Sequence, residues 1–252
     1  MLDKKGLAYN TVNLHRSAIS GTLPPVDGVP VGAHPLVKRL LKGVFHRRPP
    51  RRRLFPSWDA GAIFAVFNSW TRPLAPFQLL RKCAFLLAMA SARRPSELAS
   101  FKFSSNFMIL SGDSVRFLPS KLSKTDRVGH LGPAIRIARL PFKEHCPVNA
   151  LEDYLLFRSS LALRHDYLFV KLSFPYAPLS TSSFSSHISA LFRSAGIHAP
   201  PGSTRAMSVS HAFASGSSLD SILRAGDWSG AQTFFRFYCR DLDRFEGARD
   251  TS

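Results

Sequence analysis

Four segments of the chain carry residues that could do chemistry on a phosphate group. In the first, SARRPSELAS, Glu97 follows Arg94 by one helical turn. The planar guanidinium of an arginine matches two phosphate oxygens, and an acidic residue one turn away can orient it. The simpler interpretation is an ion pair on a helix surface, which stabilises a helix by about a few tenths of a kcal/mol. Both interpretations stay open on this segment alone.

A lysine-rich loop and the start of a late helix form the second and third segments. Lys124, with Lys121 and Arg127 nearby, could enter a DNA groove or give a proton to a leaving oxygen, although such loops are also charged for solubility. In STRAMSVSHAFASG, Ser203 is predicted to cap a helix that has Arg205 in its first turn. Because a helix N-terminus already favours anions, a basic residue at this place indicates a bound phosphate.

The fourth segment, GDWSGAQTFFRFYCR, contains Trp228 and Tyr238. A tyrosine can attack phosphorus when neighbouring cations lower its pKa or stabilise the developing charge. Most tyrosines in a run such as FFRFY pack in a core, so this segment alone favours packing.

The composition indicates a folded protein with a polyanionic partner. Among 252 residues, Lys and Arg number 34 and Asp and Glu number 16, which gives a net charge of +18. This excess predicts nucleic acid as the partner, whereas 45% hydrophobic residues, including 21 Phe, exclude a disordered chain. The longest apolar run, Cys83 to Ala92, has about half the length that a membrane span needs, so no membrane contact is expected.

The cysteines predict the compartment and the absence of a metal centre. Cys83, Cys146 and Cys239 lie far apart and show no metal-binding spacing. No apolar signal segment follows Met1. We therefore expect reduced thiols in an intracellular protein, without a metal ion or another cofactor.

Positive charge concentrates near the amino terminus, because half of the excess lies in residues 1–53. This region ends in HRRPPRRR, residues 46–53, whose prolines block a helix and favour an extended basic connector. A solvated linker or a nuclear-import patch is the alternative interpretation of the same run. A domain boundary near residue 53 is expected in either case.

Hydrophobic spacing predicts a mostly helical chain with one small antiparallel sheet, which is the α+β class. Apolar runs around a Gly-Asp turn predict a hairpin over 107–118, and alternation in AIRIARL predicts a third strand over 134–140. Before the connector, helices are predicted over 10–23 and 34–45. After it, with Ser57 as the first cap, helical segments are predicted over 57–70, 76–92, 148–163, 182–195, 203–215, 219–225 and 232–238.

The order of the four segments resembles the tyrosine recombinase, or phage integrase-like, family. An arginine in an R-P-S-E-L turn, a lysine in a β-hairpin, an arginine opening a late helix, a tryptophan and a carboxy-terminal tyrosine follow one another as in that family. The 23-residue interval from Arg205 to Trp228 also matches. The chain looks most like recombinases of eukaryotic mobile elements, that is, of transposable elements. This order disfavours a basic structural protein that matches by chance.

The resemblance implies site-specific cutting and rejoining of duplex DNA without a metal or cofactor. Tyr238 would attack the scissile phosphate and form a 3′-phosphotyrosyl link, leaving a free 5′-hydroxyl. Arg94 and Arg205 would hold the nonbridging oxygens as charge builds on them. Trp228 would donate its indole N–H to the same phosphate.

Further roles follow from the same resemblance. Lys124 would be the general acid for the departing 5′-oxygen, with Lys121 as the alternative, and Glu97 would orient Arg94. Residues 54–252 would form the catalytic domain, and residues 1–53, with the basic linker 46–53, a partial helical core-binding domain. The expected DNA contacts outside the reaction centre are Arg47, Arg48, Arg51, Arg52, Arg53, Lys121 and Arg127. Family members usually act as tetramers on DNA, so we expect a homotetramer, nuclear in a eukaryotic host.

Two departures from the family pattern keep a second hypothesis open. Gly202 replaces the histidine that usually lies three residues before the second arginine. Loss of one acid–base group lowers a rate by about 10²–10⁴-fold. Core-binding helices expected before GLAYNTVNL are absent, so we expect a truncated or decayed copy. The alternative function is therefore that of a catalytically inactive relative that only binds DNA.

Overall fold

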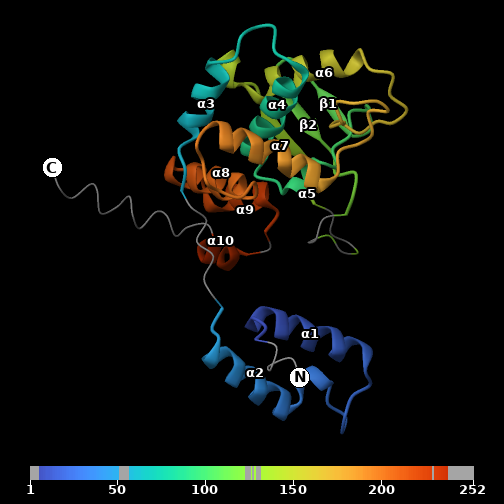
Figure 1. The fold of residues 1–252 in the computed structure, drawn as a ribbon, viewed down its shortest axis with the longest axis vertical. Coiled ribbons are helices and arrows are strands. Elements are labelled where there is room, and N and C mark those ends of the chain that lie inside the picture. Colours follow the sequence, from blue (N-terminus) through green and yellow to red (C-terminus); the bar gives the residue numbers. More distant parts are fainter. Residues whose placement is uncertain are drawn as a thin grey trace, which may run out of the picture. The chain divides into compact units, whose positions relative to one another are not determined.

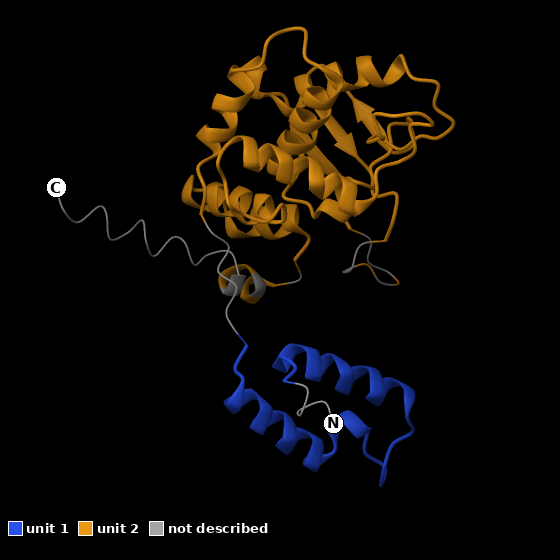
Figure 2. Cartoon of the chain, viewed as in Figure 1, with its two compact units in different colours: residues 1–54 blue, residues 55–252 orange. Residues whose placement is uncertain are grey.

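The computed structural model describes residues 6–50, 57–122, 126, 128, 132–228 and 230–237. The chain divides into two compact units, residues 1–54 and 55–252 (Figure 2). Several residues singled out in the sequence lie outside the described ranges, namely Arg51, Arg52, Arg53, Lys124, Arg127, Tyr238 and Cys239.

Unit 1 is a helix pair around a very small core. It contains α1 (Tyr9–Thr22), a 3₁₀ helix (Val31–Ala33) and α2 (Pro35–Arg47). Pro35 opens α2, where its fixed φ suits the first turn and its missing N–H has no helical partner to lose. The buried side chains of this core are Val12, Leu41 and Val44. Both helices begin and end within two residues of the predicted ranges.

Unit 2 combines helices with one small sheet (Figure 1). Its helices are α3 (Ala60–Asn68), α4 (Pro76–Ser91), α5 (Pro95–Leu98), a 3₁₀ helix (Lys143–His145), α6 (Pro147–Ser159), α7 (Thr181–Ser194), α8 (Ser203–Ala214), α9 (Leu219–Gly226) and α10 (Ala231–Phe237). Its strands are β1 (Met108–Leu110), β2 (Ser114–Phe117) and β3 (Ile135–Ala138). The predicted α+β class is confirmed.

The sheet is antiparallel, in the order β1-β2-β3. Val115 pairs with Ile137, and Arg116 pairs with Arg136. Ile135 and Ile137 are buried while Arg136 is exposed, so the predicted alternation of β3 is confirmed. The buried face of this sheet packs on the helical core.

α4 forms the centre of unit 2 and lies in the middle of its helices in Figure 1. It is apolar around most of its circumference, with Leu80, Phe85 and Leu87 fully buried, and it packs against α6, α7 and α8. The core thereby fixes the position of the chain at the carboxyl end of α4. Among the described residues, none of the helices has the length and apolarity to cross a membrane.

Two predicted helix caps are wrong. Asp59, not Ser57, caps α3, and its Oδ1 accepts a hydrogen bond from the Gly61 N–H at 2.8 Å. Ser203 is the first residue of α8 rather than its cap. Its hydroxyl is unavailable for capping because it accepts a hydrogen bond from the Trp58 indole Nε1 at 2.9 Å. A local pattern could not show this partner, which lies far away in the sequence.

Candidate active site

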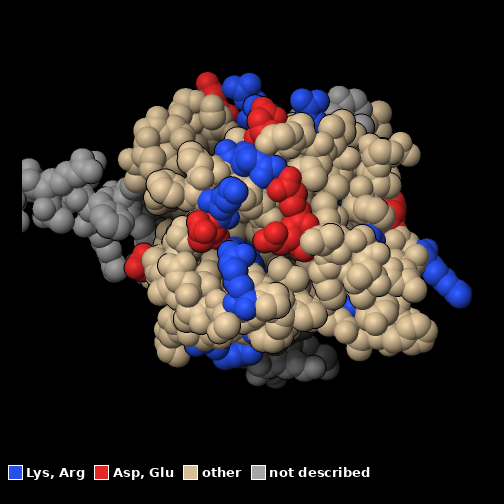
Figure 3. All heavy atoms as spheres, turned by 90° about the horizontal axis from the view of Figure 1, so that it is seen from above, with Lys and Arg blue, Asp and Glu red and all other residues tan. Residues whose placement is uncertain are grey.

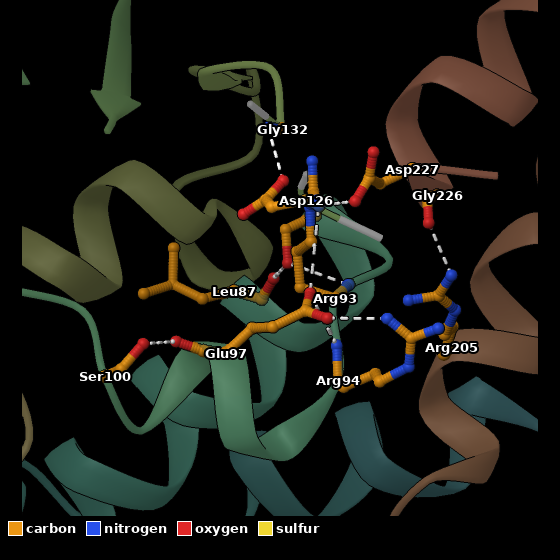
Figure 4. Close-up of polar contacts among 11 residues, drawn as sticks. Leu87, Arg93, Arg94, Glu97, Ser100, Asp126, Gly132, Arg205, Gly226 and Asp227 are labelled. Carbon is orange, nitrogen blue, oxygen red and sulfur yellow. Dashed lines mark hydrogen bonds and ion pairs between the residues drawn. The ribbon is translucent and has the colours of Figure 1, made fainter. Parts of the chain in front are cut away.

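The turn between α4 and α5 presents the arginine of the first segment. α4 ends at Ser91, where Ala92 adopts a left-handed backbone with φ 52°, and Pro95 opens α5. Glu97 accepts hydrogen bonds from the Arg94 backbone N–H at 3.3 Å and from its Nη1 at 2.7 Å. The Arg94 side chain remains 34% exposed, so its guanidinium is oriented by Glu97 and still open to a ligand (Figure 4).

Arg205 lies in the first turn of α8 and is only 3% exposed. Its Nη2 donates a hydrogen bond to the Gly226 carbonyl, and its guanidinium carbon lies 4.3 Å from the ring centroid of Trp228. The buried bond from Trp58 to Ser203 holds the start of the same helix. Arg205 is therefore positioned both by its own helix and by the turn that follows α9.

A buried ion pair joins these two parts of the site. Arg93 Nη1 lies 3.8 Å from Asp227 Oδ2 and 3.8 Å from Glu97 Oε2. The side chains of Arg93 and Asp227 are 5% and 6% exposed. Asp227 directly follows Gly226, whose carbonyl accepts the hydrogen bond from Arg205. Contacts therefore run from Arg94 through Glu97, Arg93 and Asp227 to the turn after α9 (Figure 4).

Arg94 and Arg205 thus belong to one contact network, although they lie far apart in the sequence. Figure 4 draws both guanidinium groups between α5 and α8, close to Glu97 and to the turn after α9. Two guanidinium groups held in this way can bind the two nonbridging oxygens of one phosphodiester. The arrangement can also stabilise negative charge that develops on those oxygens.

A cleft of about 240 Å³ opens beside Arg94. Its lining includes Lys121, Asp126 and Gly132, so the loop between β2 and β3 borders the same cleft as α5. Asp126 Oδ1 accepts a hydrogen bond from the Gly132 N–H at 2.6 Å. Lys121 is exposed at this cleft and places a cation beside the network.

Six of the expected site residues lie outside the described residues, namely Tyr238, Lys124, Arg127, Arg51, Arg52 and Arg53. The segment before Tyr238 is held in place by Phe234, which is fully buried in α10. The Phe234 ring centroid lies 6.2 Å from that of Trp228. The described part of α10 is therefore packed against the same turn that positions Arg205.

The position of the missing histidine is occupied by Gly202, the residue before α8. No heavy atom of the described residues lies within 4 Å of the point that a Cβ would take here, so nothing described fills the place of the side chain. His211, further along α8, is exposed, with its Nδ1 3.5 Å from Ser215 Oγ. It has no described contact with the arginine network.

Two of the expected DNA contacts of unit 1, Arg47 and Arg48, are described, and they lie at the end of α2. Arg47 is its last residue and is exposed, and Arg48 follows as a half-buried cap. Cys83 and Cys146 are buried free thiols. The described residues contain no group of three or more His, Cys, Asp or Glu side chains that could hold a metal ion.

No protein-family model matches the sequence, and no curated protein matches it either. Solved structures do match. The Tn1549 transposon integrase bound to transposon right-end DNA aligns with a TM-score of 0.66 at 13% identity, over 100% of this chain and 82% of that one. XerA recombinase aligns with a TM-score of 0.56 at 20% identity, over 99% of this chain and 79% of that one. This chain has the tyrosine recombinase fold.

A lambda integrase dimer bound to a core site also matches, with a TM-score of 0.51 at 14% identity, over 97% of this chain and 61% of that one. The predicted resemblance to tyrosine recombinases is thus confirmed as a shared fold. Within this fold, the described structure brings together four of the residues that the sequence singled out. These are Arg94, Glu97, Arg205 and Trp228.

Three residues of the site were missed by sequence reasoning, namely Arg93, Gly226 and Asp227. Arg93 stands next to Arg94 in the sequence, and nothing local indicates that it is the buried one of the two. Asp227 adopts a left-handed backbone with φ 53°, which is uncommon outside glycine. The short run Gly-Asp before Trp228 was the available signal, because Gly and Asp tolerate such turns.

Proposed function

We propose that this protein is a site-specific DNA recombinase that cuts and rejoins duplex DNA through a 3′-phosphotyrosyl intermediate, without a metal ion. The observation that carries the proposal is the contact network that holds Arg94 and Arg205 together within a tyrosine recombinase fold. In the proposal, residues 54–252 are the catalytic domain and residues 1–53 belong to a core-binding domain.

The reaction begins with attack by the Tyr238 oxygen on the scissile phosphate, while the phenolic proton passes to water because Gly202 supplies no side-chain base. Arg94 and Arg205 hold the nonbridging oxygens, and their fixed charge stabilises the transition state without rearrangement. Trp228, against which Arg205 is stacked, donates its indole N–H to the same phosphate. The 5′-oxygen leaves with a proton from Lys124 or Lys121. Attack by another 5′-hydroxyl then reverses the steps and releases Tyr238.

Duplex DNA is the proposed partner. The net charge of +18 supports this proposal, and so do the DNA-bound structures with the same fold. Phosphate contacts from such a basic chain make affinity fall steeply with salt. We further propose that the protein acts as a homotetramer on DNA. We also propose that it is intracellular, and nuclear in a eukaryotic host, and that it originates from a mobile element.

A second candidate function is DNA binding without cleavage. Gly202 favours it, because the side chain at this position in the family assists proton transfer. Both candidates predict salt-sensitive binding of duplex DNA, so binding alone does not separate them. Cleavage does.

Loss of the general acid should lower the cleavage rate, and a better leaving group should restore that rate. Lys124→Ala is expected to slow cleavage of ordinary DNA by about 10²–10⁴-fold. On a substrate whose scissile 5′-oxygen is replaced by sulfur, its rate should return to that of the wild type, because a thiolate leaves without a proton. The measurement is single-turnover cleavage with EDTA present.

Lys121→Ala is the comparison variant on the same loop, and with Lys124 as the general acid its chemical step should proceed at wild-type rates on both substrates. If the sulfur substrate rescues Lys121→Ala and not Lys124→Ala, Lys121 is the acid instead. If the wild type cleaves neither substrate while it still binds DNA in a salt-sensitive manner, the binding function replaces the recombinase.

A further inference from the structure

α4 carries a lysine inside the core of unit 2. Lys82 is 6% exposed, and its Nζ lies 5.8 Å from the ring centroid of Phe67. None of the described residues forms a hydrogen bond or an ion pair with its ammonium group. Lysines are almost never buried without a partner. Among the described residues, Lys82 therefore has a cation–π contact with Phe67 but no carboxylate within ion-pair distance.

The Lys82 side chain borders a small pocket at the beginning of α4. This pocket has a cavity volume of about 160 Å³. It is lined by Phe67, Asn68, Trp70, Arg72, Leu74, Lys82 and Glu144. Its wall is thus part aromatic and part charged, and its size suits a small group rather than a drug-sized ligand, for which pockets measure about 300–1,000 Å³.

Two cations, Lys82 and Arg72, and one carboxylate, Glu144, line the pocket. Burial lowers the pKa of Lys82 below its ordinary value of 10.5, and the guanidinium of Arg72 lowers this pKa further. Asp153 and Glu144 act in the opposite direction. Neither carboxylate lies within ion-pair distance of Lys82 or Arg72 in the described structure. Lys82 and the exposed Arg72 therefore repel each other beside the pocket, and an oxyanion bound between them would relieve that repulsion.

This pocket is separate from the candidate active site. Lys82 lies nine residues before Ser91, the end of α4, so about 14 Å of helix axis separate it from the turn that holds Arg94. The connection from α3 to α4, which contains Trp70 and Arg72, runs over the end of unit 2 that is uppermost in Figure 1. Figure 3 looks onto this face, where Lys and Arg side chains gather with Asp and Glu near its centre.

We propose that Lys82 and Arg72 form a second anion-binding site, which takes a phosphate group, free or at the end of a larger molecule. The Lys82 ammonium and the Arg72 guanidinium donate charge-assisted hydrogen bonds to its oxygens. Trp70 and Phe67 shield the group from water, which strengthens these bonds. The site is independent of the proposed recombinase function.

The test compares thermal unfolding of the full chain in sodium phosphate and in sodium chloride of equal ionic strength, at about pH 8, where phosphate is a dianion. Phosphate is expected to raise the midpoint of the wild type by several degrees, with saturation. Lys82→Met should unfold at the same temperature as the wild type or higher in chloride, because an unpaired buried charge is gone. Phosphate should raise the unfolding midpoint of Lys82→Met less than that of the wild type, because this variant is expected to bind phosphate about tenfold more weakly.

Two further variants separate specific binding from general charge effects. Lys143→Met removes an exposed charge beside Glu144 outside the pocket and should respond to phosphate as the wild type does. Glu144→Gln removes a repelling carboxylate and should tighten phosphate binding by about two- to fivefold. A wild-type response to phosphate in Lys82→Met would overturn the proposal. So would a destabilised Glu144→Gln variant with unchanged phosphate affinity, because Glu144 would then be the partner of Lys82.

A nucleoside 5′-monophosphate identifies the source of the phosphate. If its Lys82-dependent affinity exceeds that of inorganic phosphate, the group belongs to a larger molecule that also contacts the aromatic wall. Equal affinities indicate the free ion. Both results require that Lys82→Met lowers the affinity, and neither depends on DNA cleavage.

The pH dependence of the free energy of unfolding tests whether the pKa of Lys82 is lowered in the folded chain. Its pKa is lower in the folded chain than in the unfolded chain, so the unfolded state binds more protons. The wild type should therefore gain stability relative to Lys82→Met as pH rises toward 10.5. The charged groups facing Lys82 are Arg72, Asp153 and Glu144. A difference between the two proteins that does not change with pH would contradict the lowered pKa.

Discussion

Gly226→Ala is expected to displace the indole of Trp228 and to lower DNA cleavage by about a hundredfold or more. A Cβ on Gly226, the last residue of α9, would overlap the six-membered ring of Trp228, which lies in the turn that follows. The carbonyl of Gly226 also accepts the hydrogen bond from Arg205, so any shift of this residue moves the arginine. Overpacking of this kind should also lower the free energy of unfolding by about 1–3 kcal/mol.

The measurements are single-turnover cleavage of a nicked duplex and unfolding in urea. Gly112→Ala is the matched control, because no heavy atom of the described residues lies within 4 Å of the Cβ that it would add. This control should cleave and unfold as the wild type does. Wild-type cleavage and stability in Gly226→Ala would show that the turn does not position Trp228 and Arg205.

Arg205→Lys is expected to lower the cleavage rate by about 10²–10³-fold while the affinity for duplex DNA changes little. Lysine keeps the positive charge but loses the planar fork. It therefore cannot hold the Gly226 carbonyl, stack on Trp228 and bind the phosphate with one rigid group, as Arg205 is placed to do. The affinity is retained because nonspecific DNA binding depends on the number of charges.

Rates and affinities should be measured on the same DNA over a series of salt concentrations. Arg224→Lys is the control, since Arg224 is exposed near the end of α9 and close to Gly226 in the sequence. Its rate should match that of the wild type. If Arg205→Lys cleaves as fast as Arg224→Lys, Arg205 does not contact the phosphate in the transition state.

Much of the fold was predictable because it depends on local patterns. The spacing of apolar residues located α1, α2, α4 and α8 closely, and alternation located β3 with its buried isoleucines. The contact between Arg94 and Glu97 was also predictable, since residues three apart on a helix are neighbours. These predictions required only a few consecutive residues each.

The remaining features depend on contacts between distant segments. The Arg93–Asp227 ion pair joins the end of α4 to the turn after α9, and no local pattern links these two residues. The hydroxyl of Ser203 accepts a hydrogen bond from the distant Trp58 indole, whereas the sequence predicted that it caps α8. Lys82 interrupts an apolar helix, where a lysine is expected to face solvent, and only the tertiary structure shows that it is buried, beside Phe67 of α3.

The buried ion pair gives the site a physical link between its two arginines. Removing one partner of such a pair leaves an uncompensated charge in the interior and destabilises a protein by about 3–5 kcal/mol. Because Arg93 contacts Glu97 as well as Asp227, the orientation of Arg94 is tied to the turn that holds Arg205. This link explains how residues from α5 and α8 keep a common geometry.

The central claim is that Tyr238 attacks DNA, and covalent trapping tests it most directly. The full chain is incubated with EDTA and with nicked duplexes that carry candidate element ends, then denatured and separated on a gel. We expect a DNA-linked protein band with the wild type and with the control Tyr176→Phe, and none with Tyr238→Phe. A band that persists in Tyr238→Phe would contradict the assignment of the nucleophile, and no band with the wild type, while salt-sensitive DNA binding remains, would contradict cleavage itself.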